Sequence, residues 1–346
     1  MPLPANDSLA DMQFLLRGVS RSFYLSIRLL PTALRRPVAV AYLLARAADT
    51  LADTPGRAAN ERLERLRALA TAIDSGAPAP NVSVFDGAQA FAADAAEQRL
   101  LAALPQCLSW LAALPVADAD DIRTVLRHIV QGQSLDLERF PDPARVRALA
   151  DRGQLEQYTY LVAGCVGEFW TDLCLRHVPG FATLPASAMR ELGRDYGMGL
   201  QLVNILRDAG TDLCQGRCYL PANELAAAGL SLDDVRADPS RLMPVLAHWH
   251  ALAARRLDAG LRYAQAVNSP RIRAAGVLPA LIGVRTLALL QAAGPSALSR
   301  RVKVPRSEVR RILGRLAVTL AARGPLAAQY RRLREQPARG WDNPGR

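Results

Sequence analysis

Hydrophobic positions recur every three to four residues from Leu9 to Tyr330, which is the period of an amphipathic helix. The apolar residues are mostly Ala and Leu, and only 5% of the residues are aromatic. Runs that alternate Val, Ile or Thr with polar residues, typical of strands, do not occur. The pattern therefore predicts an all-α protein, because this composition favours helices over sheets.

Prolines divide this helical pattern. Pro31 and Pro37 are predicted to bound a short connection after the first helix, and residues 74–86 are predicted to form a loop. None of the connections is long enough to separate two domains. We therefore expect a single helical domain around a central cavity over residues 1–335, and a disordered tail over residues 336–346.

Charge is concentrated near the C-terminus. The formal net charge is +11, and residues 300–346 carry thirteen Arg or Lys against three acids, which gives +10. Such a segment suits nucleic acid, anionic lipid or phosphorylated substrates. Aromatic residues do not alternate with these arginines as stacking platforms for bases would, so we expect no nucleic-acid partner. A peripheral contact with an anionic membrane is the expected role.

The N-terminal part lacks the pattern of a secretory signal peptide. The apolar run over residues 38–44 is interrupted by Arg46 and Asp49. It is too short to span a bilayer, which takes about 20 apolar residues. These features predict a cytoplasmic protein that is at most peripheral to a membrane.

Two polar stripes lie within apolar helical segments. The first consists of Tyr42, Arg46, Asp49 and Asp53, at spacings of four, three and four residues. The second consists of Gln201, Asn204, Asp208 and Asp212, at spacings of three, four and four residues. Each stripe falls on one face of a helix. Unpaired buried charge is costly, so each stripe is predicted to face a partner or a ligand.

Paired carboxylates one helical turn apart are suitable ligands for Mg²⁺, with Mn²⁺ as an alternative, since hard ions take oxygen ligands and share substrate phosphates. The two pairs are predicted to lie on facing helices around a diphosphate, with Arg21, Arg46 and Arg207 in contact with phosphate. Gly197 and Gly199 would allow a close approach to the second helix. A lone DxxxD pattern is typical of a solvated helix face, but two copies with Arg and amide neighbours favour the metal site.

Four stretches resemble the squalene/phytoene synthase family, also called head-to-head trans-isoprenyl diphosphate synthases. They are residues 20–24 (SRSFY), 41–54 (AYLLARAADTLADT), 158–170 (YTYLVAGCVGEFW) and 199–221 (GLQLVNILRDAGTDLCQGRCYLP), in the order the family has them. The likeness covers residues 15–313 and looks closest to the family's bacterial squalene synthases.

The resemblance implies an isoprenoid synthase fold and a set of site residues. Asp49 and Asp208 would be catalytic, as would Tyr158 or Tyr160 near the reacting carbons. Asp49, Asp53, Asp208 and Asp212 would bind Mg²⁺. The residues implied around the substrates are Ser20, Arg21, Phe23, Tyr42, Arg46, Gln201, Asn204 and Arg207. Squalene synthases often carry an extra acid where this chain has Ala52 and Thr211, which puts the number of bound ions in question.

The implied reaction joins two molecules of farnesyl diphosphate through presqualene diphosphate and reduces the product with NADPH to squalene. Lys303 is the only lysine of the chain. With Arg306 it lies in a basic stretch similar to one that follows the last core helix of squalene synthases. We therefore expect Lys303 and Arg306 to hold the phosphates of NADPH.

Three alternatives remain at this point. A dehydrosqualene or phytoene synthase would use the same fold without a reductant, and a presqualene diphosphate synthase would stop at the intermediate. The third alternative is a non-catalytic binding or assembly subunit. Intact aspartates in both stripes argue against that last alternative.

Overall fold

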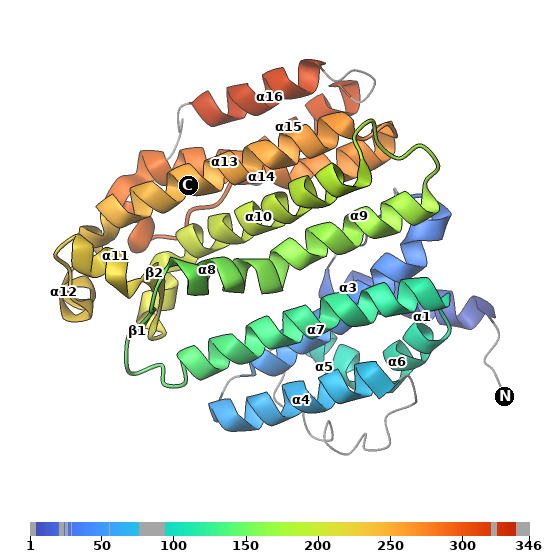
Figure 1. Cartoon of the computed structure of the whole chain (residues 1–346), viewed down its shortest axis with the longest axis horizontal. Coiled ribbons are helices and arrows are strands. Elements are labelled where there is room, and N and C mark those ends of the chain that lie inside the picture. The colour runs from blue at the N-terminus through green and yellow to red at the C-terminus, as the bar shows by residue number, and fades with distance from the viewer. Residues whose placement is uncertain are drawn as a thin grey trace. The chain divides into compact units, whose positions relative to one another are not determined.

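The computed structural model describes residues 5–20, 24, 27–28, 30–54, 56–75, 94–319 and 324–336 (Figure 1). Arg21 and Phe23, most of the predicted loop over residues 74–86, and the predicted tail after Gln336 lie outside these residues. Contacts group the chain into two compact units. Unit 1 contains residues 1–141 and 172–177, and unit 2 contains residues 142–171 and 178–346. The single domain over residues 1–335 stays a prediction.

Unit 1 is built around α3, which packs against each of the other five helices named here and carries the first polar stripe. Its helices are α1 (Ala5–Val19), α3 (Thr32–Ala52), α4 (Ala59–Ser75), α5 (Ala95–Ala102), α6 (Leu104–Ala112) and α7 (Val116–Arg139). Contacts of α3 with α1, α4, α5, α6 and α7 leave it one partly open face.

Unit 2 is built around α10, which packs against α8, α13, α14 and several shorter elements and carries the second stripe. Its longer helices are α8 (Arg152–Thr159), α9 (Cys165–His177), α10 (Ala186–Cys214), α13 (Met243–Ala266), α14 (Pro270–Ala293), α15 (Arg306–Thr319) and α16 (Gly324–Glu335). Its short elements are β1 (Arg147–Leu149), η3 (Tyr160–Gly164), β2 (Arg217–Pro221), α11 (Ala222–Ala227), α12 (Leu232–Ala237), η4 (Pro239–Leu242) and η5 (Gly294–Leu298). The last two turns of α9 belong to unit 1.

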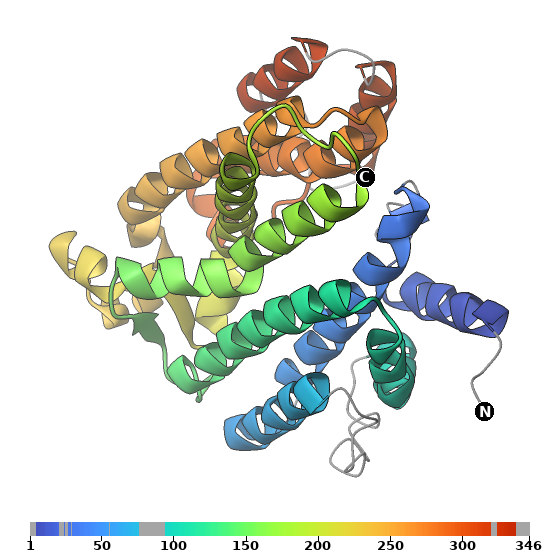
Figure 2. The same cartoon turned by 45° about the vertical axis from the view of Figure 1, so that its right-hand side comes forward.

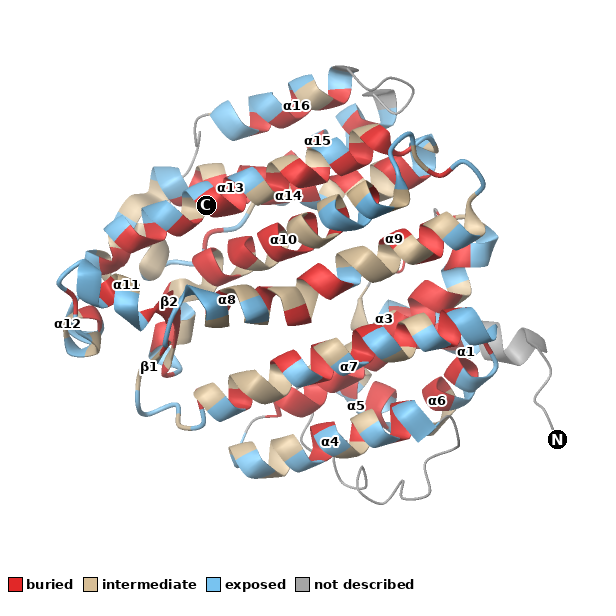
Figure 3. Cartoon of the chain, viewed as in Figure 1, coloured by how far each residue is buried: buried red, intermediate tan, exposed pale blue. Residues whose placement is uncertain are grey.

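Burial follows the helical period along both central helices (Figure 3). Apolar side chains of α3 and α10 face their neighbours and are withdrawn from water, which is the main favourable term in folding. In unit 2, α16 lies along α14 and α15, as both views show (Figures 1 and 2). The prediction of an all-α protein is confirmed, since strands contribute only β1 and β2 within the described residues.

Two local features differ from the sequence predictions. Pro37 does not bound a connection: it lies inside α3, in its second turn, where its side chain is buried. The strands β1 and β2 were not predicted, and they pair in parallel with Arg147 opposite Arg217. Strands of three and five residues carry too few positions to show an alternating pattern, so only tertiary contacts define them.

Among the described residues, the stretch Pro270–Leu298 is long and apolar enough to cross a membrane by composition alone. More than half of it is buried inside unit 2, where α14 packs against α10, α13 and α16. Arg285, in the middle of α14, forms a buried ion pair with Glu308 at 2.7 Å. A buried core helix accounts for this pattern, because the charged group of Arg285 finds its partner within the protein.

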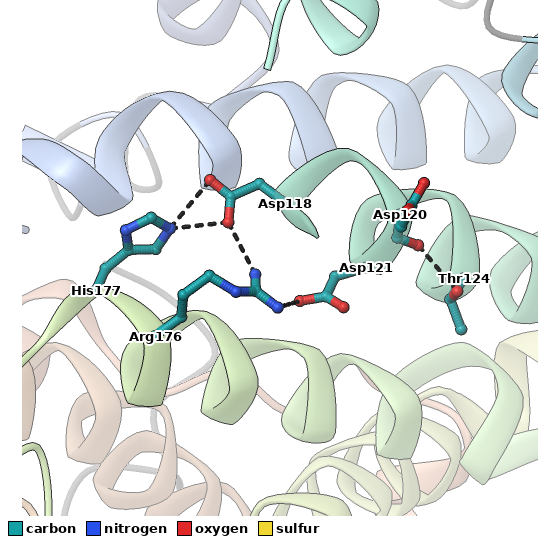
Figure 4. Close-up of polar contacts among 6 residues, drawn as sticks. All are labelled: Asp118, Asp120, Asp121, Thr124, Arg176 and His177. Carbon is teal, nitrogen blue, oxygen red and sulfur yellow. Dashed lines mark hydrogen bonds and ion pairs between the residues drawn. The ribbon is translucent and has the colours of Figure 1, made fainter. Parts of the chain in front are cut away.

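A buried carboxylate in unit 1 ties α7 to the end of α9 (Figure 4). The Asp118 residue is only 1% exposed, and it accepts hydrogen bonds from Arg176 and His177, each at 2.8 Å. Arg176 also donates to Asp121 at 2.6 Å. Such a buried acid is stable only while its partners remain, because removal of one partner of a buried pair leaves the other partner uncompensated.

We predict that Asp118→Ala lowers the free energy of unfolding by about 3 kcal/mol, since it leaves Arg176 without its buried partner. Urea unfolding measures the change. The control is Asp120→Ala on the same helix, whose carboxylate is 63% exposed and pairs with Arg123 at 2.9 Å. That variant should lose less than about 1 kcal/mol. Equal losses in both variants would contradict a structural role for Asp118.

Candidate active site

The first acid pair lies on the one face of α3 that is not fully buried. Tyr42, Arg46 and Asp49 are partly exposed, and Asp53, just after the last turn, is exposed. The residues between them are buried, apart from the partly exposed Ala45. The backbone N–H of Asp53 donates to the carbonyl of Asp49, so the helical spacing extends to both carboxylates. The predicted shared face is therefore present in the structure.

Charge around Asp49 is dominated by acids. Arg46 lies 3.9 Å from the Asp49 carboxylate and makes a much closer ion pair with Glu97 of α5, whose helix begins at an Asp94 cap. Burial, supported by the charges of Asp53 and Glu97, raises the pKa of Asp49 to about 6, although Arg46 acts in the opposite direction. The acids Asp53 and Glu97 thus both oppose ionisation of Asp49, and Arg46, which lies beside it, is shared with Glu97.

Gln133 of α7 contributes a second signal at this place. Its amide N–H donates to an oxygen of Asp49. Its own Oε1 is buried and has no hydrogen-bond partner within the described part of the chain. A divalent cation with bound water would compensate the charge of the acids around Asp49. Its bound water would donate a hydrogen bond to the Gln133 oxygen. The residues of α3 therefore fit a Mg²⁺ ion.

The second acid pair lies on α10, whose position depends on close backbone contacts. A Cβ on Gly197 would lie 2.2 Å from the carbonyl oxygen of Ala163, and one on Gly167 would lie 1.9 Å from that of Gly193. A Cβ on Gly199 would lie 2.8 Å from the Cβ of Arg256 in α13. The predicted close approach at Gly197 and Gly199 is confirmed, and the neighbour at this point is another helix.

Each acid of α10 pairs with its own arginine. The guanidinium of Arg207 donates to Asp208 at 3.0 Å, and Arg217 of β2 lies 3.2 Å from Asp212. Hydrogen bonding to Asp208 raises the pKa of Arg207. In contrast to the first pair, this pair is electrically balanced in the protein alone. A metal ion on the two carboxylates would release both guanidinium groups toward phosphate.

Neither pair forms a complete metal cage. Within the described residues, no three His, Cys, Asp or Glu side chains come together as a metal site. Mg²⁺ does not need one, because it commonly binds through one or two carboxylates, several waters and the phosphates of a substrate. The arrangement fits a metal that binds together with a diphosphate.

The two candidate tyrosines have different surroundings. Tyr158 stacks on Tyr219, with ring centroids 5.0 Å apart. Tyr160 begins the π-helical turn η3, and its hydroxyl donates to Glu168 at 3.1 Å. Burial and Glu168 raise the pKa of Tyr160 to about 12, so its phenol stays protonated at neutral pH. Single π-helical turns within α-helices are frequent at functional sites.

The remaining predicted residues are placed as follows. Gln201 accepts a hydrogen bond from Asn204 at 3.2 Å on the partly exposed face of α10. Ser20 directly follows α1 and is partly exposed. Lys303 and Arg306 are exposed in and after the segment that connects η5 to α15, and this segment is held by the fully buried Val302.

Sequence reasoning missed several polar neighbours of the stripes. Glu97 and Gln133 surround the first pair, Arg217 pairs with the second, and Glu168 accepts the bond from Tyr160. Each of these four residues lies on a different helix or strand from the acid or tyrosine that it contacts, or from the arginine that it pairs with. A polar residue on an otherwise buried helix face was the available signal for Gln133, and no local pattern marked the others.

Comparison with known proteins identifies the family. The profile of the squalene/phytoene synthase family matches residues 16–308. A bifunctional lycopene cyclase/phytoene synthase of Phaeosphaeria nodorum is 32% identical over 235 residues, which are 67% of this chain and 37% of that protein. The chain therefore belongs to the squalene/phytoene synthase family, and it spans little more than a third of that relative.

Solved structures show the same fold. The structure of TcSQS with the ligand BPH1237 superposes with a TM-score of 0.71 at 21% identity, covering 94% of this chain and 96% of that one. Squalene synthase HpnC from Alicyclobacillus acidocaldarius superposes with a TM-score of 0.60 at 21% identity, covering 84% and 97%. The predicted isoprenoid synthase fold is confirmed.

We predict that Asp49→Asn stabilises the metal-free protein at pH 7, by up to about 1 kcal/mol because the side chain is 47% exposed. The folded-state pKa of about 6 lies above the ordinary value of an aspartate in water, so ionisation of Asp49 opposes folding. The gain should therefore shrink as the pH falls from 6 to 4. Thermal unfolding from pH 4 to pH 8 tests this, with the exposed Asp233→Asn as control. A gain in stability that does not depend on pH would contradict the raised pKa of Asp49.

Proposed function

We propose that this protein condenses two prenyl diphosphates head to head with the help of Mg²⁺. The observation that carries the proposal is that the central helix of each unit presents one acid pair beside an arginine on its partly exposed face, while most of the neighbouring residues of that helix are buried. Membership of the family supports the reaction class, since the family consists of head-to-head condensing prenyltransferases.

In this proposal Asp49, Asp53, Asp208 and Asp212 bind the metal. Bound Mg²⁺ neutralises the charge that develops on diphosphate as its bond to the allylic carbon breaks. Arg46 and Arg207 bind phosphate oxygens through paired N–H groups. Both arginines already lie beside the acids, so the exchange of a carboxylate for phosphate requires only a side-chain rotation.

Tyr160 is our candidate for the polar aromatic group near the reacting carbons. One face of the Tyr158 ring is taken by Tyr219, whereas the hydroxyl of Tyr160 donates to Glu168 from the π-helical turn η3. A phenol that stays protonated cannot remove a proton, so its role is to orient diphosphate by a hydrogen bond or to stabilise a carbocation through its ring. Apolar surroundings keep water from quenching that cation.

For the product, we favour an unreduced hydrocarbon of the phytoene type. The support is the 32% identity over 235 residues to a protein named as a bifunctional lycopene cyclase/phytoene synthase. Squalene, made with NADPH from two molecules of farnesyl diphosphate, is the second candidate. The exposed Lys303 and Arg306 favour squalene, because an ammonium group and a guanidinium group together suit the phosphates of a dinucleotide.

We predict that Asp49→Asn and Asp208→Asn each lower turnover at least about 100-fold, because a neutral amide is a far weaker metal ligand than a carboxylate. Product formation from farnesyl and geranylgeranyl diphosphate is measured across a Mg²⁺ titration. Asp233→Asn serves as the control and should keep its rate. Near-normal turnover of either variant at saturating Mg²⁺ would contradict the ligand assignment.

We also predict that the wild-type protein makes the same hydrocarbon with and without NADPH, since the favoured product needs no reductant. Mass spectrometry of the products across an NADPH titration measures this. If NADPH instead converts the product to squalene, the second candidate holds. Lys303→Ala should then raise the KM for NADPH and divert product to presqualene diphosphate or dehydrosqualene, whereas the condensation itself continues.

A further inference from the structure

Glu97 is a buried acid beside the first acid pair, and the proposed reaction gives it no role. It lies in the first turn of α5, and its residue is 9% exposed. The side chain of Asp94 caps this helix and accepts the backbone N–H of Glu97 at 2.9 Å, which fixes the turn that carries the carboxylate. A buried carboxylate is costly unless a cation accompanies it, so Glu97 needs a positive partner close by.

Arg46 of α3 supplies this positive charge. Its Nη2 donates to Oε1 of Glu97, in the closer of its two ion pairs. Its Nη1 is 3.9 Å from Oδ2 of Asp49, which is beyond hydrogen-bond distance. The Nε of Arg46 is buried and has no hydrogen-bond partner among the described residues, so Nε does not set the position of the guanidinium. Glu97 therefore decides where the charge of Arg46 lies.

Sequence spacing alone would pair Arg46 with Asp49, because residues three apart on a helix are neighbours. On α7 of the same unit, Asp120 and Arg123 have the same separation, and their charged groups are 2.9 Å apart. The corresponding distance on α3 is 3.9 Å. Within the described residues Arg123 pairs with no other acid, whereas Arg46 has a competing carboxylate in Glu97. The competing carboxylate accounts for the open pair on α3.

Burial explains why Glu97 prevails in this competition. Its side chain is 12% exposed, whereas that of Asp49 is 47% exposed. Water stabilises the more exposed carboxylate of Asp49 and screens its attraction for Arg46. The carboxylate of Glu97 would lose its compensating charge if Arg46 moved away, and that loss costs far more. Arg46 therefore stays with Glu97 and leaves Asp49 open.

The second acid pair has the opposite arrangement. Asp208 accepts a hydrogen bond from Arg207 at 3.0 Å, and Asp212 lies 3.2 Å from Arg217. Each of these arginines contacts its acid directly, so a cation has to displace it. On α3, by contrast, a cation meets a carboxylate whose neighbouring arginine is already engaged by another acid.

We propose that Glu97 is a positioning residue for the metal site: it holds Arg46 away from Asp49 and so keeps that carboxylate available to Mg²⁺. Glu97 acts through Arg46 and does not contact the ion. Without Glu97, Arg46 closes onto Asp49 and competes with the metal. The inference rests on the proposed function, because it requires that Asp49 binds the metal.

A crystal structure of the metal-free Glu97→Met variant tests the position of Arg46. Methionine is similar in length to glutamate, favours helices and fills buried space, so α5 should remain in place. We expect Arg46 to move to hydrogen-bond distance of Asp49, about 2.7–3.2 Å, compared with 3.9 Å in the wild-type protein. An Arg46 side chain that stays away from Asp49 in the variant would overturn the proposal.

Electron paramagnetic resonance of Mn²⁺, without any substrate, measures the consequence for the metal. We expect Glu97→Met to weaken Mn²⁺ binding about fivefold, since the ion must then break one exposed ion pair. The double variant Arg46→Met with Glu97→Met keeps the net charge of the wild type and has no arginine to close onto Asp49. It should bind Mn²⁺ within about twofold of wild type. A double variant as weak as Glu97→Met would overturn the proposal and indicate that Glu97 is a direct ligand.

Asp94→Asn separates this contact from the effect of overall charge. It removes a charge three residues before Glu97, and asparagine caps a helix as well as aspartate does. Asp94 is exposed, and it forms no ion pair with Arg46 in the described part of the chain. The variant should bind Mn²⁺ within about twofold of wild type, because salt screens exposed charges. A loss as large as that of Glu97→Met would overturn the positioning role.

Asp49→Asn separates this inference from the proposed function. If Asp49→Asn binds Mn²⁺ as well as wild type, the proposed metal site on α3 fails, and the role of Glu97 fails with it. If Asp49→Asn loses Mn²⁺ binding while Glu97→Met keeps the wild-type affinity, the metal site holds and only the role of Glu97 is overturned. We expect both variants to bind Mn²⁺ more weakly than wild type, with the larger loss in Asp49→Asn.

Discussion

Charge on a helix that is surrounded by other helices needs compensation, and this requirement organises the protein. α3 and α10 are each packed by several neighbours, so only one face of each remains partly open. Their carboxylates lie on that face, where water, an arginine or a metal reaches them. The two pairs meet the requirement differently: each acid of α10 pairs with one arginine, Arg207 of α10 or Arg217 of β2, whereas Arg46 of α3 is shared between Asp49 and Glu97.

The difference between the pairs has a chemical consequence. An acid pair with excess negative charge attracts a cation by itself, whereas a balanced pair exchanges its arginines for a cation only when an anion takes the arginines. A metal diphosphate supplies the cation and the anion together. In the proposed function, the protein would therefore favour the complex of metal and diphosphate over either ion alone, which is the selectivity that a prenyl diphosphate enzyme needs.

Backbone contacts determine how accurately these groups are held. Glycines at the crossing of α10 with η3 and α9 let the backbones touch, so Asp208 and Tyr160 belong to one rigid part of unit 2. A larger residue at Gly193 or Gly197 would push the helices apart. By contrast, α15 and α16 are attached through buried polar contacts at the outer side of the same unit, and they build a surface that the acid pairs do not use.

The sequence by itself determined the helical class and the faces of both stripes, because spacings of three and four residues have one meaning on a helix. It also indicated the close approach at Gly197 and Gly199. Tertiary structure alone decided which groups compensate each acid, since Glu97, Gln133 and Arg217 arrive from other elements. It likewise decided the pairing of β1 with β2 and the place of Pro37 inside α3. These depend on contacts between distant segments, which no local pattern encodes.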